Sequence, residues 1–156
     1  QKQLIILLSF WIPMDKIILT TGTFNLCHAG HIRLFEFCSQ FGKVVVGINA
    51  DPYLWDKYGK DKTIPLTDRA YVLKSCKYVD EVVVFTEREP SKLIENIKPD
   101  LYVKGPDYNG KDIPEKIILN KLNIMLAIQP AEKEYNSSEL IKFYFNSSFN
   151  KLNKYS

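Results

Sequence analysis

The sequence predicts an α/β protein built on one open, doubly wound sheet of parallel strands. Short apolar runs alternate along the chain with patterns typical of helices, which is the order that a parallel sheet covered on both faces produces. The apolar runs are rich in Val, Ile and Leu and lack polar alternation, as expected of strands buried on both faces. The predicted strands are residues 16–21, 44–49, 81–85, 101–104 and 124–129.

The predicted helices lie between these strands. In residues 29–41, four apolar positions from Leu34 to Phe41 follow the i, i+3, i+4, i+7 spacing of one helix face, and Gly42 ends the pattern. Further helices are predicted at 67–77 with Thr67 as the N-cap, at 91–98 before Pro99, at 114–122 from Pro114, and after Ser137 or Ser138. Ligands of such sheets bind beyond the C-terminal ends of the strands, where the winding direction reverses.

The length of 156 residues fits one domain. We expect that domain to span residues 14–145, with an apolar extension at 1–13 and a polar, fraying tail at 146–156. The apolar run at 4–12 is too short to span a bilayer, which takes about 20 helical residues. It also lacks the features of a signal peptide. We therefore expect an added helix or strand packed on the domain rather than a membrane anchor.

The net charge and the cysteine count limit the classes of function and the compartment that the sequence favours. The net charge of +3, from 21 basic and 18 acidic residues, is too small to favour nucleic acid as the main partner. Three cysteines (Cys27, Cys38 and Cys76) are an odd number without disulfide or metal spacing, which predicts reduced thiols and a cytoplasmic protein. Cys27 is interpreted as a small packing residue rather than a reactive thiol.

The most informative motif lies where the first predicted strand meets the first helix. His28 and His31 are the only histidines of the chain, and they flank Gly30 at the start of that helix. Side chains three positions apart on a first helical turn point the same way, and the free N–H groups of a helix N-terminus attract anions. This pattern predicts a cradle for a polyphosphate. The alternative is a tight turn with two incidental surface histidines.

These residues resemble the signature G-x-F-D-x-x-H-x-G-H of the cytidylyltransferase-like nucleotidyltransferases, a Rossmann-like family. The matching residues are Gly22, Phe24, His28, Gly30 and His31. The resemblance implies that both histidines donate hydrogen bonds to a nucleoside triphosphate, and that residues 21–25 (Thr21, Gly22, Thr23, Phe24 and Asn25) help to bind it. Asn25 stands where most members carry Asp, which keeps the acceptor oxygen and loses the charge. That departure bears more on the substrate than on the reaction class.

Three longer segments, residues 64–73, 79–85 and 99–108, extend the resemblance. Together they look like the adenylyltransferase domain of ADP-heptose synthesis, which acts on D-glycero-β-D-manno-heptose 1-phosphate, and the likeness runs from about residue 15 to 143. Pro106 replaces the second glycine of that family's Val-Lys-Gly-Gly-Asp-Tyr turn, so one backbone N–H is missing here.

Three side chains in these segments are candidates for binding the acceptor. Lys104 ends the fourth strand, where it can face a phosphate of substrate or nucleotide, or simply be solvated. Asp107 can orient a sugar hydroxyl or a base, or form a turn. Arg69 can reach a phosphate, or pair with Asp68 or another neighbour.

Two further segments are implied by the resemblance. Relatives carry lysines in the polar loop at residues 56–62 that clamp the triphosphate, and Lys57 and Lys60 are the candidates here; the alternative is a solvated loop of mixed charge. Asn136, Ser137 and Ser138 are similar to the family's final triphosphate-binding motif, or else provide only a helix N-cap. The cytidylyltransferases place an arginine and a glycine just before it, where this chain has Ala131 and Glu134, and this favours the adenylyl branch.

The predicted function is transfer of a nucleoside monophosphate, from ATP by resemblance, to a sugar phosphate with release of pyrophosphate. The nucleophile is already an anionic phosphate, so no general base is needed, and His28, His31, Lys57 and Mg²⁺ would act by stabilising charge. No protein metal-ligand set is expected, because Mg²⁺ is usually held by phosphates and water. The alternatives are a CTP-dependent enzyme for glycerol 3-phosphate or phosphoethanolamine, and a nucleotide-binding module without catalysis. Resemblance also implies a homodimer, to which residues 1–13 can contribute.

Overall fold

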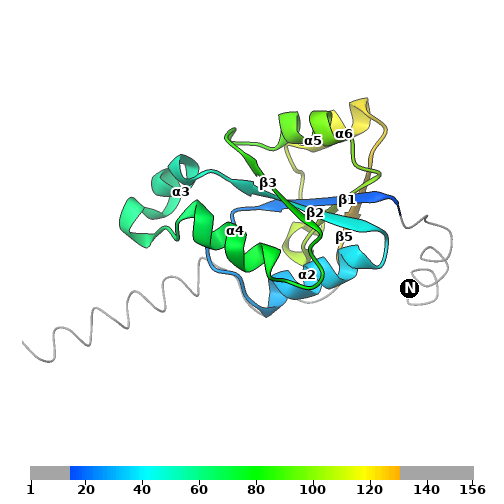
Figure 1. Ribbon diagram of the computed structural model, residues 1–156. Helices are drawn as coiled ribbons and strands as arrows, with labels where there is room; N and C mark the ends of the chain where they lie inside the picture. Colours follow the sequence, from blue (N-terminus) through cyan, green and yellow to red (C-terminus); the bar gives the residue numbers. More distant parts are fainter. Residues whose placement is uncertain (1–14, 131–156) are drawn as a thin grey trace, which may run out of the picture.

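A computed structural model describes residues 15–130 of the chain. Its sheet has five strands: β1 (Ile17–Gly22), β2 (Lys43–Asn49), β3 (Glu81–Phe85), β4 (Leu101–Lys104) and β5 (Met125–Ile128). All neighbouring strands are parallel, in the order β3-β2-β1-β4-β5 (Figure 1). This confirms the predicted doubly wound parallel sheet. The predicted extension at 1–13, the final helix and the tail lie outside the described residues.

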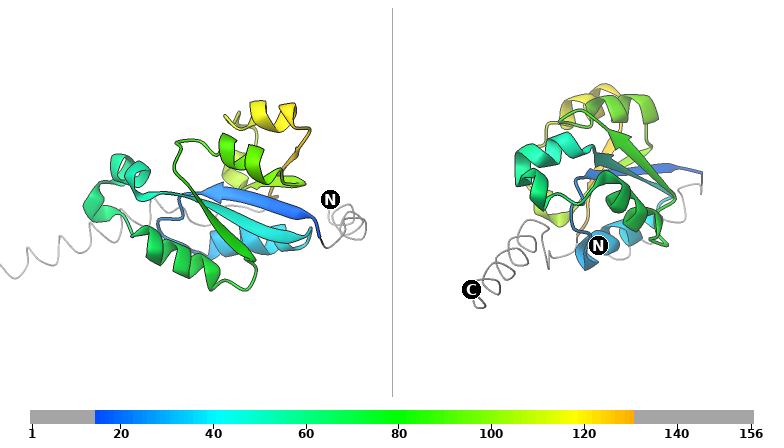
Figure 2. Two further views of the ribbon diagram at one scale, coloured as in Figure 1. Left: turned by 45° about the horizontal axis from the view of Figure 1, so that its top comes forward. Right: turned by 60° about the vertical axis from the view of Figure 1, so that its left-hand side comes forward.

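Helices cover both faces of the sheet. Helices α2 (Ala29–Ser39) and α4 (Leu66–Lys74) lie on one face, and α5 (Ser91–Ile97) and α6 (Lys116–Lys121) on the other (Figures 1 and 2). Helix α3 (Asp51–Tyr58) extends beyond the end of β2 at one margin of the sheet. Two short 3₁₀ turns, η1 (Lys60–Lys62) and η2 (Pro106–Tyr108), complete the structure described.

Each face of the sheet has its own apolar core, because successive residues of a strand point to opposite faces. Towards α2 and α4, Ile18 and Val46 pack with Phe35 and Leu73. Towards α5 and α6, the core contains Leu19, Val45, Ile94, Tyr102 and Leu119. The strands are therefore buried on both sides, as their continuous apolar sequence predicts.

The structure corrects three predicted elements. Residues 56–62, expected to be a polar loop, contain the end of α3 and all of η1; Leu54 is fully buried and anchors α3, whose other side chains are exposed or only partly buried. Thr67 does not cap α4, which begins one residue earlier with Pro65 at the N-cap position. Helix α6 begins at Lys116 rather than at Pro114.

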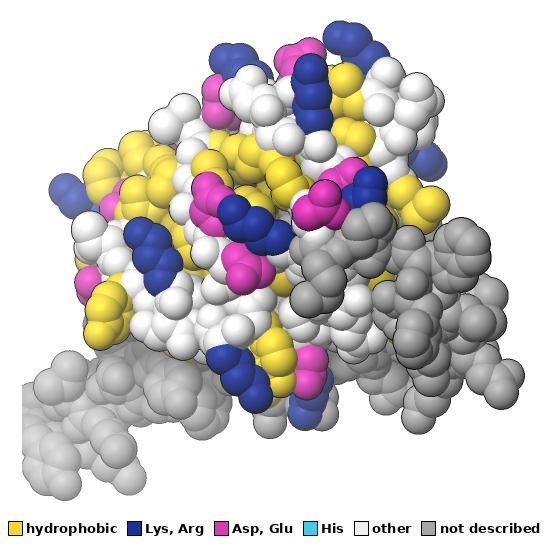
Figure 3. Space-filling model, turned by 45° about the vertical axis from the view of Figure 1, so that its right-hand side comes forward, with side chains coloured by type: hydrophobic (Ala, Val, Ile, Leu, Met, Phe, Trp, Pro, Cys, Tyr) yellow, Lys and Arg dark blue, Asp and Glu magenta, His cyan; other side chains and the backbone are white. Residues whose placement is uncertain are grey.

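Charged side chains of both signs are mixed over the surface shown in Figure 3. The described residues include exposed ion pairs such as Lys121–Glu95 and Lys43–Glu81. That face of the described residues therefore presents no large field of one sign.

Candidate active site

The two histidines form the first turn of α2. His28 is the N-cap residue, and its Nδ1 accepts a hydrogen bond from the Gly30 N–H at 3.1 Å. The Nδ1 of His31 accepts one from the His28 N–H at 3.3 Å. This is a capping box in which imidazoles replace the usual hydroxyl and carboxylate, and it satisfies N–H groups that a helix start otherwise leaves open.

The capping box also sets what each imidazole offers to a ligand. A ring nitrogen that accepts a hydrogen bond carries no proton, so in the neutral ring the proton resides on Nε2, a tautomer inferred here from the hydrogen bonds. The two rings stack with centroids 3.9 Å apart and an interplanar angle of 28°. His28 and His31 therefore place two Nε2–H donors on neighbouring rings of one helix turn, and donors of this kind suit phosphate oxygens.

Phe24 supports this pair from inside the core. Its ring is buried and meets the His31 ring edge-on at 5.0 Å and the Phe35 ring at 5.4 Å. A Cβ added at Gly22 would lie 3.1 Å from the Phe24 ring, so this close approach favours glycine at that position. The Phe24 ring thus supports the His31 imidazole from the core side.

Asn25 holds the histidine loop to the segment that follows η1. Its side chain is buried; Nδ2 donates to the Lys62 carbonyl at 3.0 Å, and Oδ1 accepts from the Ile64 N–H at 2.8 Å. A carboxylate could accept from Ile64 but could not donate to Lys62. These contacts explain why an amide is compatible with this position in this chain, since both polar atoms of the Asn25 amide bond the protein backbone.

We therefore expect Asn25→Asp to lower the free energy of unfolding by about 1–3 kcal/mol, because it sets a buried carboxylate against a carbonyl oxygen. Urea denaturation monitored by circular dichroism would measure the change. Asp61→Asn in the neighbouring exposed turn is the matched control and should change the free energy of unfolding by no more than about 0.5 kcal/mol. Equal stability of Asn25→Asp and wild type would contradict this role.

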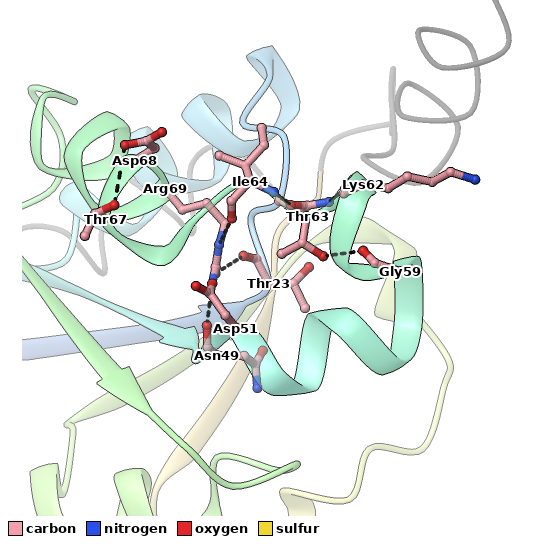
Figure 4. Close-up of polar contacts among 11 residues, drawn as sticks. Thr23, Asn49, Asp51, Gly59, Lys62, Thr63, Ile64, Thr67, Asp68 and Arg69 are labelled. Carbon is pink, nitrogen blue, oxygen red and sulfur yellow. Dashed lines mark hydrogen bonds and ion pairs between the residues drawn. The ribbon is translucent and has the colours of Figure 1, made fainter. Parts of the chain in front are cut away.

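Arg69 is the most buried charged side chain of the region, at 2% exposure. Its guanidinium reaches four acceptors on four segments: the carbonyl oxygens of Ile64 (3.0 Å), Thr23 (2.9 Å) and Asn49 (2.9 Å), and Asp51 Oδ1 (2.8 Å). Figure 4 shows these contacts converging on the one side chain. The structure therefore gives Arg69 a framework role, and its ion-pair partner is Asp51, not the adjacent Asp68.

A cavity of about 370 Å³ lies beyond the C-terminal ends of four strands, a size typical of small-molecule sites. Of the predicted site residues, those lining it are Thr21, Gly22, Thr23, Lys57 and Lys104. Those outside its lining are Phe24, Asn25, His28, His31, Arg69 and Asp107. The loop that follows β1 therefore runs from the cavity lining at Thr23 to the N-cap of α2 at His28.

Lys104 does not end in open solvent. Its Nζ lies 2.9 Å from Glu115 Oε1 and donates to Thr21 Oγ1 at 3.4 Å. Tyr102 Oη donates to the same Glu115 oxygen at 3.1 Å and lies 2.5 Å from Thr21 Oγ1. The Lys104 ammonium also lies 4.7 Å from the centroid of the Tyr108 ring. These contacts close a buried polar ring that joins the ends of β1 and β4 to the start of α6.

Burial and the charges of this ring shift the pKa values of Glu115 and Tyr102. Burial by itself raises the pKa of Glu115, but the charge and hydrogen bond of Lys104 outweigh it, and the net pKa lies below its ordinary value. Burial, and then the negative charge of Glu115, raise the pKa of Tyr102 well above its usual range. Glu115 is therefore a carboxylate at neutral pH, and Tyr102 a neutral phenol that can donate to it.

The remaining predicted residues lie at the margins. Lys57 lines the cavity from α3 with its ammonium 5.1 Å from the Tyr58 ring centroid, whereas Lys60 lies over the Trp55 ring. Asp107 is in η2, next to Tyr108 of the cavity lining but not itself part of that lining.

Burial raises the pKa of the Cys27 thiol to about 11, which supports its interpretation as a packing residue. Asn136, Ser137 and Ser138 lie outside the described residues.

Sequence reasoning missed several residues of the cavity. They are Asn49, Tyr53, Phe85, Arg88, Glu89, Pro90, Tyr108, Pro114 and Glu115. Most of them end a strand or follow shortly after one, so the rule that ligands bind at strand C-termini could have identified that part of the set. Glu115 follows β4 at a longer distance, and only the folded chain brings it to Lys104.

A parallel sheet in this order, with paired histidines after its first strand, defines a class of nucleotide-binding α/β proteins. The chain belongs to the cytidylyltransferase-like family of nucleotidyltransferases: the model of that family matches residues 19–143. This confirms the resemblance found in the motifs of the sequence.

The curated relatives include bifunctional HldE proteins. The chain is 40% identical over 112 residues to that of Aliarcobacter butzleri and 35% identical over 133 residues to that of Helicobacter pylori. These matches cover 70% and 84% of this chain, but only 24% and 28% of those proteins. The chain thus spans about a quarter of the length of these relatives.

Solved structures share the fold. A lipopolysaccharide core biosynthesis protein from Thermoplasma volcanium superimposes with a TM-score of 0.62 at 25% identity, covering 78% of this chain and 98% of that one. Pantothenate synthetase from Thermus thermophilus gives 0.55 at 15% identity, covering 83% and 61%, which shows the fold alone. Between residues 15 and 130, none of the helices has the length and apolar character needed to cross a bilayer.

Proposed function

We propose that this protein transfers AMP from ATP to a sugar phosphate, resembling heptose 1-phosphate, with release of pyrophosphate. The observation that carries the proposal is the histidine corner, where two imidazoles on one helix turn follow directly on the loop that lines a cavity at the strand C-termini. The match to the family model shows that the protein is a nucleotidyltransferase. Identity of 35–40% to HldE proteins, together with the 64–73 and 99–108 segments, supports the adenylyl branch.

In this mechanism the acceptor's phosphate attacks the α-phosphorus of ATP, and pyrophosphate leaves. His28 and His31 donate hydrogen bonds to phosphate oxygens whose negative charge grows in the transition state. Lys57, an exposed residue of the cavity lining, adds a positive charge. The loop after β1 keeps nucleotide and acceptor next to each other, which lowers the entropic cost of their encounter.

Magnesium fits this site as an ion that arrives with the triphosphate. Within residues 15–130, no three His, Cys, Asp or Glu side chains cluster as ligands. Mg²⁺ in nucleotide sites is typically held by phosphate oxygens and water with at most one or two carboxylates. When bound, it would neutralise phosphate charge and so assist departure of pyrophosphate.

A substrate panel tests the proposal. Pyrophosphate release would be measured with ATP or CTP, each combined with an aldose 1-phosphate, glycerol 3-phosphate or phosphoethanolamine. We expect ATP with an aldose 1-phosphate to give the highest kcat/KM. Preference for CTP with an alcohol phosphate would replace the proposal by the cytidylyl alternative, and binding of ATP without pyrophosphate release from any pair would identify a non-catalytic module.

Three further expectations belong to this proposal. Asn136, Ser137 and Ser138 would bind the outer phosphates of ATP, as their resemblance to the final family motif implies. The protein would work as a homodimer, by the same resemblance. It would act in the cytoplasm, in keeping with three thiols that are all free.

A further inference from the structure

We propose that the Lys104–Glu115 pair at the base of the cavity binds hydroxyl groups of the acceptor, and that the acceptor's phosphate is bound by other cations of the same cavity. This inference rests on the proposed function, since it concerns the acceptor of that reaction. It makes Glu115 a specificity-determining residue. It also changes the role expected for Lys104 from the sequence, which was to face a phosphate.

Charge is the first reason. The Lys104 ammonium lies 2.9 Å from a Glu115 oxygen, and each of the two side chains is only 7% exposed. A phosphate dianion brought to Lys104 would meet the Glu115 carboxylate at nearly the same distance. Attraction and repulsion would then largely cancel, and the low dielectric of a buried site would strengthen both. The pair is therefore a poor place for a phosphate.

The hydrogen-bond pattern is the second reason. Thr21 and Tyr102 hold the pair in place, while Tyr108 packs against the ammonium. Both members of the pair line the cavity, so an ammonium donor and a carboxylate acceptor stand side by side at its base. A hydroxyl group donates one hydrogen bond and accepts others. It can satisfy both partners at once, which neither a phosphate nor an alkyl group can do.

Other cations remain for the phosphate. Lys57 and Arg88 line the same cavity, and neither forms an ion pair with any residue in the described part of the chain. Glu89 is the other acidic residue of the lining. A polyhydroxylated phosphate ester would thus place its hydroxyls at the base and its phosphate towards the rim.

Binding measurements by titration calorimetry test the inference without requiring turnover. The probes are inorganic phosphate, D-mannose 1-phosphate and the monodeoxy analogues of that sugar phosphate. In the wild type, we expect at least one deoxy analogue to bind about 10- to 100-fold more weakly than the parent, because a hydrogen bond to a charged group is lost. In Glu115→Gln this difference should shrink to within about twofold.

A double variant controls for the destabilisation that an unpaired buried charge would cause. Glu115→Gln alone leaves Lys104 buried beside an uncharged amide, so Lys104→Met with Glu115→Gln removes both charges together. In the double variant, the deoxy difference should also vanish, while inorganic phosphate binds within about twofold of the wild type. Lys57→Met and Arg88→Met should instead weaken inorganic phosphate and every sugar phosphate alike. Glu95→Gln, at an exposed surface pair, is the matched control.

Two results would overturn the inference: loss of inorganic phosphate binding in the double variant, or equal binding of parent and all deoxy analogues by the wild type. Its failure can be told apart from failure of the proposed function. Deoxy discrimination that depends on Glu115, in a protein that releases no pyrophosphate, sinks only the proposed function. Turnover of a sugar phosphate whose deoxy discrimination survives Glu115→Gln sinks only this inference.

Discussion

Replacing either histidine by a residue that preserves the capping box is expected to lower kcat by about 10²–10³-fold without loss of folding. His28→Asn keeps a side-chain acceptor at the N-cap, where Asn is among the best residues. His31→Gln keeps the acceptor that a capping box uses three residues later. Both variants retain the helix start and remove the stacked imidazoles, and the amide N–H groups that they introduce are not held at the position of Nε2 while the amide oxygen caps the helix. Pyrophosphate release at saturating ATP measures the effect.

The alanine variants supply the comparison. His28→Ala loses both the donor and the N-cap, so it should fall in activity as far as His28→Asn and also lose about 0.5–2 kcal/mol of stability. Thermal melting separates the two effects. If His28→Asn and His31→Gln both kept most of the wild-type kcat, the histidines would be capping residues only, and the proposed mechanism would fail.

Arg69→Met should be the most destabilising substitution in this region, lowering the free energy of unfolding by about 3–5 kcal/mol. Methionine fills much of the same volume, but it leaves three carbonyl oxygens and Asp51 without the guanidinium that bonds them. Lysine should recover only part of the loss, because one ammonium cannot match the planar fork of five donors. Urea denaturation at neutral pH measures both variants.

Arg88→Met is the matched control for that experiment. Arg88 is also an arginine of this end of the sheet, but it is exposed, so its replacement should change stability by no more than about 0.5 kcal/mol. Asp51 is 25% exposed, so solvent weakens its ion pair, and Asp51→Asn should cost clearly less than Arg69→Met. Equal stability of Arg69→Met and Arg88→Met would show that the buried contacts contribute nothing.

Sequence reasoning predicted the sheet well because its signals are local. Strands β3 and β4 have the predicted bounds, since an apolar run between polar turns marks each of them. Helix α3 was missed because only one of its residues, Leu54, is buried, so its aromatic side chains do not repeat along one buried face. Its apolar pattern is therefore too weak to detect.

The site residues likewise divide into those that local spacing predicts and those whose partners come from distant segments. His28 and His31 are predictable because their spacing on one helix turn brings them together without help from the rest of the chain. The partners of Arg69 and Lys104 come from distant segments, so no spacing could reveal them. Two cations that appeared equivalent as phosphate ligands thus differ: Arg69 is used by the framework, and Lys104 is paired with an acidic residue of the cavity.

The segment between α3 and α4 is bound to the histidine loop from both sides. Asn25 bonds its backbone at Lys62 and Ile64, and Arg69 bonds Ile64 as well as Thr23. By composition, this stretch of Gly, Lys, Asp and Thr would be chosen first for inserting a tag or a peptide. Its backbone is instead fixed at Lys62 and Ile64 by three hydrogen bonds, so we expect an insertion there to separate it from Asn25 and Arg69.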